Sequence, residues 1–368
     1  MRTLSVRRRS LASRGTDSLV LASACLLAWS GVALAQEAQA AAPEAAPVAP
    51  AAQETAPVAP VAPEAVPAPA AAEPPAPALE EAPKPAPAKP PPYSLPWQLR
   101  PVAPGNVVRL DSSYGFYKSP TTSKSGSALV STLLGSYKIL PDLALIGRVG
   151  LVANSPPEAP QPAAQSATSM LNPVIAGLYG IKLSPSFKLG LFLGVTVPVG
   201  TGGGTIQSQG DRDRAAANGA GIATRSAFDN AMFAVNYLTV FPGVDFAYVH
   251  GGFTAQVEAT IFKLTKVRGP DTIDHTNTNF TTGLHVGYFV IPMLSIGAEL
   301  RHQRWLSTPN GLKSPARDTT TVAFGPRLHF KLSDSIWFRP GVSLSLPIDD
   351  PLKASEYKIV QLDLPVAF

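Results

Sequence analysis

The sequence predicts an all-β fold, a transmembrane antiparallel β-barrel of about 12 strands, preceded by an export leader and a disordered Ala/Pro-rich segment. Three observations lead to this class. Apolar residues recur at every second position in many segments, the links between these segments alternate between short and long, and the last segment is an apolar strand pattern ending in Phe368. The domain boundaries that we expect are 1–35 for the leader, 36–96 for the Ala/Pro-rich linker and 97–368 for the barrel.

The first 35 residues have the pattern of a secretory signal peptide. A basic start with five arginines precedes the apolar run LVLASACLLAWSGVALA, and Ala33 and Ala35 supply the small residues of a cleavage site. A membrane-anchoring helix would need about 20 apolar residues, which is more than this run offers. A lipoprotein site at Cys25 is the other alternative, although ASAC lacks the usual large aliphatic residue. We therefore predict export in a Gram-negative bacterium, with cleavage near Ala35.

Loss of the leader changes the charge balance and the cysteine count. Of 30 basic and 25 acidic residues, the leader holds five arginines and one aspartate, which leaves 25 and 24 in the mature chain. A near-neutral chain gives no support to nucleic-acid binding, so we predict no nucleic-acid partner. Cys25 is the only cysteine, and its removal excludes disulfides and thiolate metal sites.

Residues 36–96 form the predicted periplasmic linker. Up to Pro92 the segment consists almost entirely of Ala, Pro, Val and Glu and has no aromatic residue. Proline removes backbone donors, and without large apolar side chains the segment cannot build a core, so we expect an extended, polyproline-like spacer. The alternative to a plain linker is a tether to the cell wall or a docking site for a periplasmic protein.

Alternation of apolar and polar residues predicts the strands. In FKLGLFLGVTVPVG the apolar residues occupy every odd position from Phe187, with Lys188 and Thr196 among the residues between them. LSIGAELRHQRW and SIWFRPGVSLSLP alternate in the same way. The strands are expected near 106–117, 128–139, 142–154, 170–183, 186–199, 236–249, 252–266, 278–290, 293–305, 319–331, 335–347 and 357–368.

The links between these strands indicate how the barrel lies in a membrane. LPD, SPS, HGG, PM and SDS are tight turns, and the other links are longer, up to the stretch 200–235. Short and long links alternating around an even strand count, with both barrel ends on the short-turn side, are typical of outer-membrane barrels. Prolines inside several strands leave counts of ten or fourteen open: Pro173, Pro198, Pro326, Pro340 and Pro365.

The last strand carries a candidate insertion signal. One apolar face holds Val360, Leu362, Leu364, Val366 and Phe368. We expect lipid to cover this face and the strand edge to pair with the first strand, because closure satisfies every backbone group. The pattern resembles the C-terminal signal by which bacterial outer-membrane proteins are recognised. That resemblance implies the barrel-assembly machinery as a partner, besides outer-membrane lipid and lipopolysaccharide.

Residues 97–368 resemble the transporter- and porin-like β-barrels of the Gram-negative outer membrane. LGLFLGVTVPVGTGGG, LHVGYF and AELRHQRW are similar to stretches of such barrels, including those associated with pathways that degrade aromatic compounds. The resemblance implies an outer-membrane location and carries no functional residue across. The rival architecture, a secreted β-sandwich, should expose Lys, Glu and Asp, whereas the polar faces here are rich in Gly, Ser and Thr.

The inward faces of the strands hold the candidate site residues. The predicted lumen-lining residues are Arg109, Arg148, Glu258, His285, Glu299, Arg301, Arg327, Arg339 and Asp363. The same faces also carry Asp111, Lys188, Gln256, Gln303, His329 and Gln361. These groups either pair across the barrel as a plug or line a narrow polar conduit, and both alternatives stay open. Basic residues outnumber acidic ones on these faces, so we expect a weak preference for anions.

The long link 200–235 is the most informative loop. It starts with GTGGG, continues with four alternating charges at 211–214, and ends in Ala-rich sequence suited to one or two short helices. We expect it either to fold inward and narrow the pore, as long loops of porins do, or to stay mobile outside. GTGGG lacks the Lys-Ser/Thr of a phosphate loop.

The function that these features predict is a narrow channel for passive uptake or export of small solutes. We expect no cofactor, no metal site, no catalytic residues and no enzymatic activity. His275 and His302 could serve a lipid hydrolase, but no Asn-His with a Ser-bearing stretch accompanies them. A structural anchor with a Pro-rich tether is the second alternative.

Overall fold

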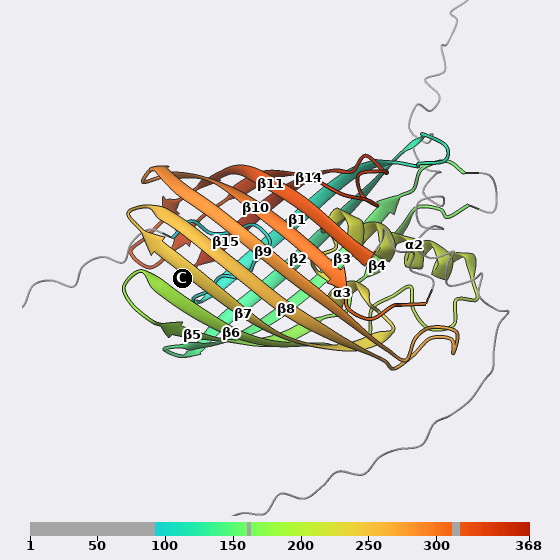
Figure 1. Cartoon of the computed structure of the whole chain (residues 1–368), viewed down its shortest axis with the longest axis horizontal. Helices are drawn as coiled ribbons and strands as arrows, with labels where there is room; N and C mark the ends of the chain where they lie inside the picture. Colours follow the sequence, from blue (N-terminus) through green and yellow to red (C-terminus); the bar gives the residue numbers. More distant parts are fainter. Residues whose placement is uncertain (1–92, 160–162, 311–316) are drawn as a thin grey trace, which may run out of the picture. The chain divides into compact units, whose positions relative to one another are not determined.

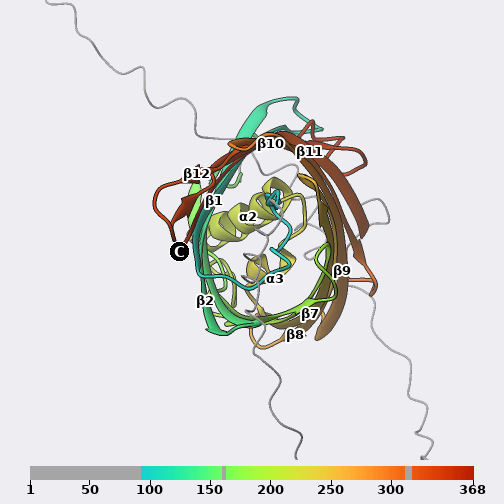
Figure 2. The ribbon, with the colours of Figure 1, turned by 90° about the vertical axis from the view of Figure 1, so that its left-hand side faces the viewer.

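Antiparallel strands close on themselves to form a β-barrel (Figures 1 and 2). The structure is a computed structural model that describes residues 93–159, 163–310 and 317–368. It has 12 strand positions, which confirms the predicted fold class and strand number. The predicted leader, with Ala33 and Ala35, and the linker up to Pro92 lie outside the described residues.

Three of the twelve positions are interrupted and carry two labels each. The strands are β1 (Val107–Lys118), β2 (Ser125–Leu140), β3 (Leu143–Ser155), β4 (Ala167–Met170), β5 (Val174–Lys182), β6 (Phe187–Thr196), β7 (Tyr237–His250), β8 (Phe253–Lys266), β9 (Thr276–Ile291), β10 (Leu294–Trp305), β11 (Asp318–Leu328), β12 (Phe330–Lys331), β13 (Trp337–Phe338), β14 (Gly341–Pro347) and β15 (Lys358–Ala367). The interruptions separate β4 from β5, β11 from β12, and β13 from β14.

Pairing of β1 with β15 closes the barrel. The two strands run antiparallel in register from Val107 opposite Ala367 to Phe116 opposite Lys358. Because β1 also pairs with β2, both edges of β1 are occupied. This closure is the one predicted from the alternating C-terminal strand.

Prolines lie at two of the three interruptions, and a further proline disturbs the ladder within β11. Pro173 lies between β4 and β5, and Pro340 lies between β13 and β14. Pro326 lies in β11 where the ladder to β14 has no partners between Phe324 and Arg327. A proline cannot donate to a ladder, so each of these strands breaks its regular pairing there without leaving the barrel wall.

Apolar side chains cover the outside of the wall. Strand residues alternate between exposed apolar side chains and buried ones, as in β10, where Ile296 and Leu300 are exposed and Glu299 and Arg301 are buried. The exposed aromatic residues Tyr137, Phe187, Tyr288 and Phe368 lie near the short-turn ends of their strands. A closed barrel with an apolar exterior, an aromatic rim and an even strand count is the architecture of outer-membrane barrels.

The long link between β6 and β7 folds into the barrel. It forms α2 (Gln209–Thr224) and α3 (Asn230–Phe233), and Figure 2 shows α2 inside the ring of strands. Ser208 caps α2 by accepting a 3.1 Å hydrogen bond from the Asp211 backbone N–H, which begins the helix in the Ala-rich sequence. Of the two alternatives for this loop, inward folding is the one observed. No helix among the described residues is long and apolar enough to cross a membrane.

A second segment enters the lumen from the opposite end. Residues Tyr93–Pro104 precede β1, form no helix or strand, and run through the interior as the cyan trace in Figure 2. Ser94, Trp97, Leu99 and Val102 are buried there. The expected boundary between linker and barrel, after residue 96, falls inside this segment. The part of the chain that lies in the lumen therefore begins four residues before the expected start of the barrel at residue 97.

Candidate functional site

The lumen has an apolar side and a charged side. The apolar side comes from β2 to β8 and packs against α3. Its buried strand residues are Val130, Ile146, Val152, Val174, Ala176, Leu178, Phe192, Phe241, Phe262 and Leu264. The charged side comes mainly from β10, β11, β15 and β1. Charged faces were predicted from the alternation. The apolar side was not predicted. β3 and β5 carry apolar residues on both faces, and their outward-facing residues alone already account for the alternation expected of a membrane strand.

A cavity of about 120 Å³ lies between these two sides. Its apolar lining includes Val174, Phe192 and Met232, and its charged lining includes Arg109 and Glu258. Residues of both inserted segments also reach it, namely Gln98–Pro101 from the N-terminal segment and Phe228–Asp229 from the β6–β7 link. The cavity is therefore bounded by the wall and by the two insertions together.

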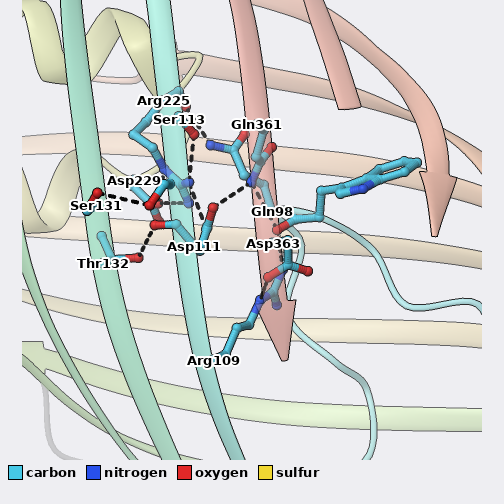
Figure 3. A network of polar contacts seen from close by, with 12 residues as sticks. Gln98, Arg109, Asp111, Ser113, Ser131, Thr132, Arg225, Asp229, Gln361 and Asp363 are labelled. Carbon is cyan, nitrogen blue, oxygen red and sulfur yellow. Dashed lines mark hydrogen bonds and ion pairs between the residues drawn. The ribbon is translucent and has the colours of Figure 1, made fainter. Parts of the chain in front are cut away.

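One ion-pair cluster joins the β6–β7 link to the wall (Figure 3). Arg225, just after α2, lies 2.7 Å from a carboxylate oxygen of Asp111 in β1 and 2.7 Å from one of Asp229. Arg148 of β3 donates two hydrogen bonds of 2.9 Å to Asp229. The turn that follows the helix is thus held to two strands by charge-assisted bonds, the stronger class of hydrogen bond.

The charges of this cluster shift the pKa values of Asp229 and Arg225, its two residues from the β6–β7 link. Burial alone would raise the pKa of the Asp229 carboxyl, but the charges of Arg148 and Arg225 outweigh it and hold that pKa below its ordinary value of 3.8. Burial likewise disfavours the charged form of Arg225, and the carboxylates of Asp111 and Asp229 more than offset it, so its pKa is raised. Both groups stay charged at neutral pH.

A second cluster binds the backbone of the N-terminal segment. Asp363 of β15 accepts hydrogen bonds from Arg109, at 2.6 Å, and from Arg327. The two arginines then donate to carbonyls of the segment: Arg109 to Pro96 and Trp97, and Arg327 to Leu95 and Pro96. Two guanidinium groups fixed by one carboxylate therefore hold three successive carbonyls of a chain that has no ladder of its own.

Glu299 satisfies the donors of the same segment. Its carboxylate accepts from the backbone N–H of Trp97 and, at 3.3 Å, from that of Gln98. Its other partner is Arg301, which donates at 2.8 and 2.6 Å. Gln361 completes the network, since its amide donates to Asp111 at 2.9 Å and accepts from Arg301 at 3.1 Å. This network connects β1, β10 and β15 inside the lumen.

Arg100 is the only charged residue of the segment Tyr93–Pro104. Its guanidinium lies 2.9 Å from Glu258 and 3.4 Å from Asp245, on the neighbouring strands β8 and β7. The same group donates to Thr260 at 2.8 Å and lies over the ring of Phe192, 4.2 Å from the centroid.

Glycines make room for this segment. A Cβ atom added at Gly180, Gly243, Gly283 or Gly287 would lie closer than 3.0 Å to Pro104, Arg100, Leu99 or Ser94, respectively. These positions belong to β5, β7 and β9. Any larger residue there would collide with the segment, so the inner wall is shaped to the chain that runs along it.

The predicted lumen residues occupy the following places. Arg109, Glu258, His285, Glu299, Arg301, Arg327 and Asp363 are buried, and Arg148 is half-buried and bonded to Asp229. Arg339 lies between β13 and β14, half-buried, with its guanidinium carbon 5.2 Å from the Trp337 ring centroid. His285 meets the Trp97 ring edge-on at 5.8 Å. In β15, Val360 and Leu362 are exposed, Leu364 and Val366 are half-exposed, and Phe368 follows the strand.

Several residues of the site were missed from the sequence. Asp245 lies between the outward residues Val244 and Phe246, and the nearby Pro242-Gly243 hid this alternation. Arg225, Asp229 and Arg100 lie outside the strands, where no periodicity can assign a direction to a side chain. Asp245 pairs with Arg100, and Asp229 pairs with Arg148 and Arg225. The missed residues add two arginines and two carboxylates, so they leave the excess of basic groups in the lumen unchanged.

The described residues contain no group of three or more His, Cys, Asp or Glu side chains that could hold a metal ion. The arrangement offers paired charges, backbone carbonyls and an apolar surface around a small space. Such a set can orient and discriminate small molecules.

Comparison with known proteins gives structural likenesses only. No family model matches the chain, and no curated protein matches it. Among solved structures it is similar to the COG4313 outer membrane channel from Pseudomonas putida F1, with 12% identity and a TM-score of 0.49 over 75% of this chain and 100% of that one. It is also similar to the KdgM porin, with 11% identity, a TM-score of 0.39 and coverage of 71% and 99%. A NanC porin structure shares 9% identity at a TM-score of 0.41, over 70% and 98%. Such identities carry no function from one protein to another.

Proposed function

We propose that this chain is an outer-membrane channel for passive uptake or export of small solutes. The observation that carries the proposal is the cavity of about 120 Å³ inside a closed barrel, lined by apolar groups on one side and paired charges on the other. A concave, partly apolar space with a few placed polar groups is the usual form of a small-molecule site. A space of this size suits only a small solute.

The two insertions define the state of this channel. Neither α2 nor the segment Tyr93–Pro104 takes part in the barrel ladder, whose pairings run from β1 round to β15. Either insertion can therefore move without breaking a hydrogen bond between strands of the wall. We propose that solutes pass when one or both insertions are displaced, and that the filled lumen is the resting state.

The exterior supports an outer-membrane location. The apolar outer band needs a lipid surround, and lipid and lipopolysaccharide are the partners that would provide it. We propose that the outward face of β15, which ends at Phe368, is read by the barrel-assembly machinery. The N-terminal segment enters at the short-turn end, so the Pro-rich linker would begin on the periplasmic side, where it could reach the cell wall or a periplasmic protein.

Conductance in planar lipid bilayers tests the proposal. The parent chain should give small single-channel currents, and a variant lacking residues 205–228 should give larger ones, because α2 no longer fills one end. A variant lacking residues 120–123, in the mostly exposed link between β1 and β2, is the control and should conduct like the parent. If neither the parent nor the α2-deleted form conducts, the channel proposal fails and a structural anchor with a Pro-rich tether takes its place.

A further inference from the structure

We infer that Asp245, Glu258, Thr260 and Phe192 form a binding site for small organic cations of the guanidinium type, and that Arg100 occupies this site as an internal ligand. The inference deepens the proposed channel function, on which it rests for its role in solute passage. A solute bearing a guanidinium group would compete with the N-terminal segment for the same position in the lumen.

The two carboxylates face each other across neighbouring strands. Asp245 of β7 and Glu258 of β8 are direct partners in the ladder, so their side chains lie on the same face of the wall. Both are buried, with 0% and 2% of their surface exposed. A cation between two adjacent buried carboxylates stabilises their charged form, because unpaired burial of charge costs far more than a hydrogen bond returns.

The remaining groups fit the shape of a guanidinium rather than that of an ammonium. Nε of Arg100 points to Asp245 at 3.4 Å, Nη1 to Glu258 at 2.9 Å, and Nη2 to the Thr260 hydroxyl at 2.8 Å. The plane lies over Phe192, with the guanidinium carbon 4.2 Å from the ring centroid. Separate acceptors for three nitrogens and an aromatic face are the features that favour a planar guanidinium.

The wall itself offers no substitute for Arg100. In the described part of the chain, Arg100 is the one cationic side chain that forms an ion pair with Asp245 or Glu258. Oδ1 of Asp245 is buried and has no hydrogen-bond partner among the described residues, so the site has acceptor capacity that Arg100 leaves unused. Gly243 adds the space, since a Cβ there would lie 2.6 Å from Nη2 of Arg100.

The other arginines of the lumen differ in how they are attached. Arg109, Arg301 and Arg327 belong to strands of the wall and keep their carboxylates, Asp363 and Glu299, whatever the inserted segment does. Arg100 belongs to the segment without ladder hydrogen bonds. Withdrawal of the segment therefore vacates one site specifically, the one that carries two carboxylates and no other cation.

Calorimetric titration in detergent tests the inference on the full-length chain. Arg100→Gln keeps the segment but vacates the site, and the probes are methylguanidinium and methylammonium. Methylguanidinium should bind Arg100→Gln at least about tenfold more tightly than it binds the parent, and methylammonium should bind at least about tenfold more weakly than methylguanidinium. Adding Asp245→Asn and Glu258→Gln should abolish binding, whereas adding Asp334→Asn at the exposed surface should not.

Equal affinity for the two probes, equal affinity for parent and variant, or binding that survives loss of both carboxylates would each overturn the inference. If Arg100→Gln does not fold, Arg100→Lys serves instead, because it keeps a charge but cannot reach all three acceptors. Methylguanidinium should then bind the lysine variant more tightly than the parent, and equal affinity would overturn the inference. The titration needs no current, so a chain that binds the probe but never conducts would refute the channel and leave the site standing.

Discussion

The two segments inside the barrel pair their backbone N–H and C=O groups in different ways. α2 satisfies most of its backbone hydrogen bonds internally and meets the wall with small buried side chains, among them Ala216, Ala217 and Ala220. The segment Tyr93–Pro104 has no internal ladder, and its amides and carbonyls bond to side chains of the wall, chiefly Glu299, Arg109 and Arg327.

This difference explains the distribution of charge in the lumen. A helix can lie against small and apolar groups because its polar backbone is already paired, whereas an extended chain needs donors and acceptors at each peptide. The charged side of the lumen is therefore the side that holds the extended chain at residues 94–98. Four substitutions test this contrast.

Glu299→Ala should be the most damaging, because it removes the acceptor of two backbone donors and leaves Arg301 buried without its carboxylate. Breaking a buried ion pair in this way costs about 3–5 kcal/mol. The urea midpoint of the barrel in detergent should fall accordingly, and Glu299→Gln, which keeps an acceptor, should cost less. An effect no greater than that of Asp334→Ala, a change at an exposed ion pair, would contradict the role assigned to Glu299.

Asp229→Asn tests the charged anchor of the helical insertion. At pH 6 it should destabilise the barrel by about 1.5–3 kcal/mol, the range for hydrogen bonds to charged groups. The pKa of Asp229 is depressed in the folded state, so its contribution is complete above its ordinary pKa of 3.8 and is lost as the pH falls through the lower folded value. Denaturant midpoints of parent and variant should therefore converge below pH 4. A difference that stays constant down to pH 2 would show that charge is not its source.

Ala217→Leu tests whether α2 depends on small side chains. Ala217 is fully buried, so the added atoms would overpack the interface at a cost of about 1–3 kcal/mol. Ala215→Leu is the matched control, since Ala215 lies in the same helix but is partly exposed, and it should cost less. Equal denaturant midpoints for the two variants would mean that the helix does not pack closely against the wall.

Trp97→Phe should have the smallest effect on stability, under about 1 kcal/mol, because a large aromatic ring is kept. The Trp97 indole N–H has no hydrogen-bond partner among the described residues, so its removal breaks no bond. The backbone of Trp97, which bonds to Glu299, Arg109 and Gln361, is unchanged. A loss of stability as large as that of Glu299→Ala would show that the Trp97 ring, and not the backbone of the segment, holds the segment in the lumen.

The sequence predicts the wall of this molecule far better than its contents. Alternation identifies a residue such as Glu299 as inward because the neighbours Ala298 and Leu300 must face outward, and a period of two leaves no third choice. Turn lengths and the pattern of β15 then specify the closure. The same reasoning fails for Trp97, Arg100 and Arg225, since irregular chain has no period and the direction of each side chain depends on contacts distant in sequence.

The short connection between the inserted segment and β1 has a consequence for how the molecule is made. Gly105 and Asn106 are the only residues between Pro104 and the start of β1 at Val107, and β1 forms the seam with β15. The segment thus lies within two residues of the strand that closes the barrel. We therefore expect the segment to enter the lumen as the seam forms, so that the barrel is already filled when its assembly ends and opens only when an insertion is displaced later.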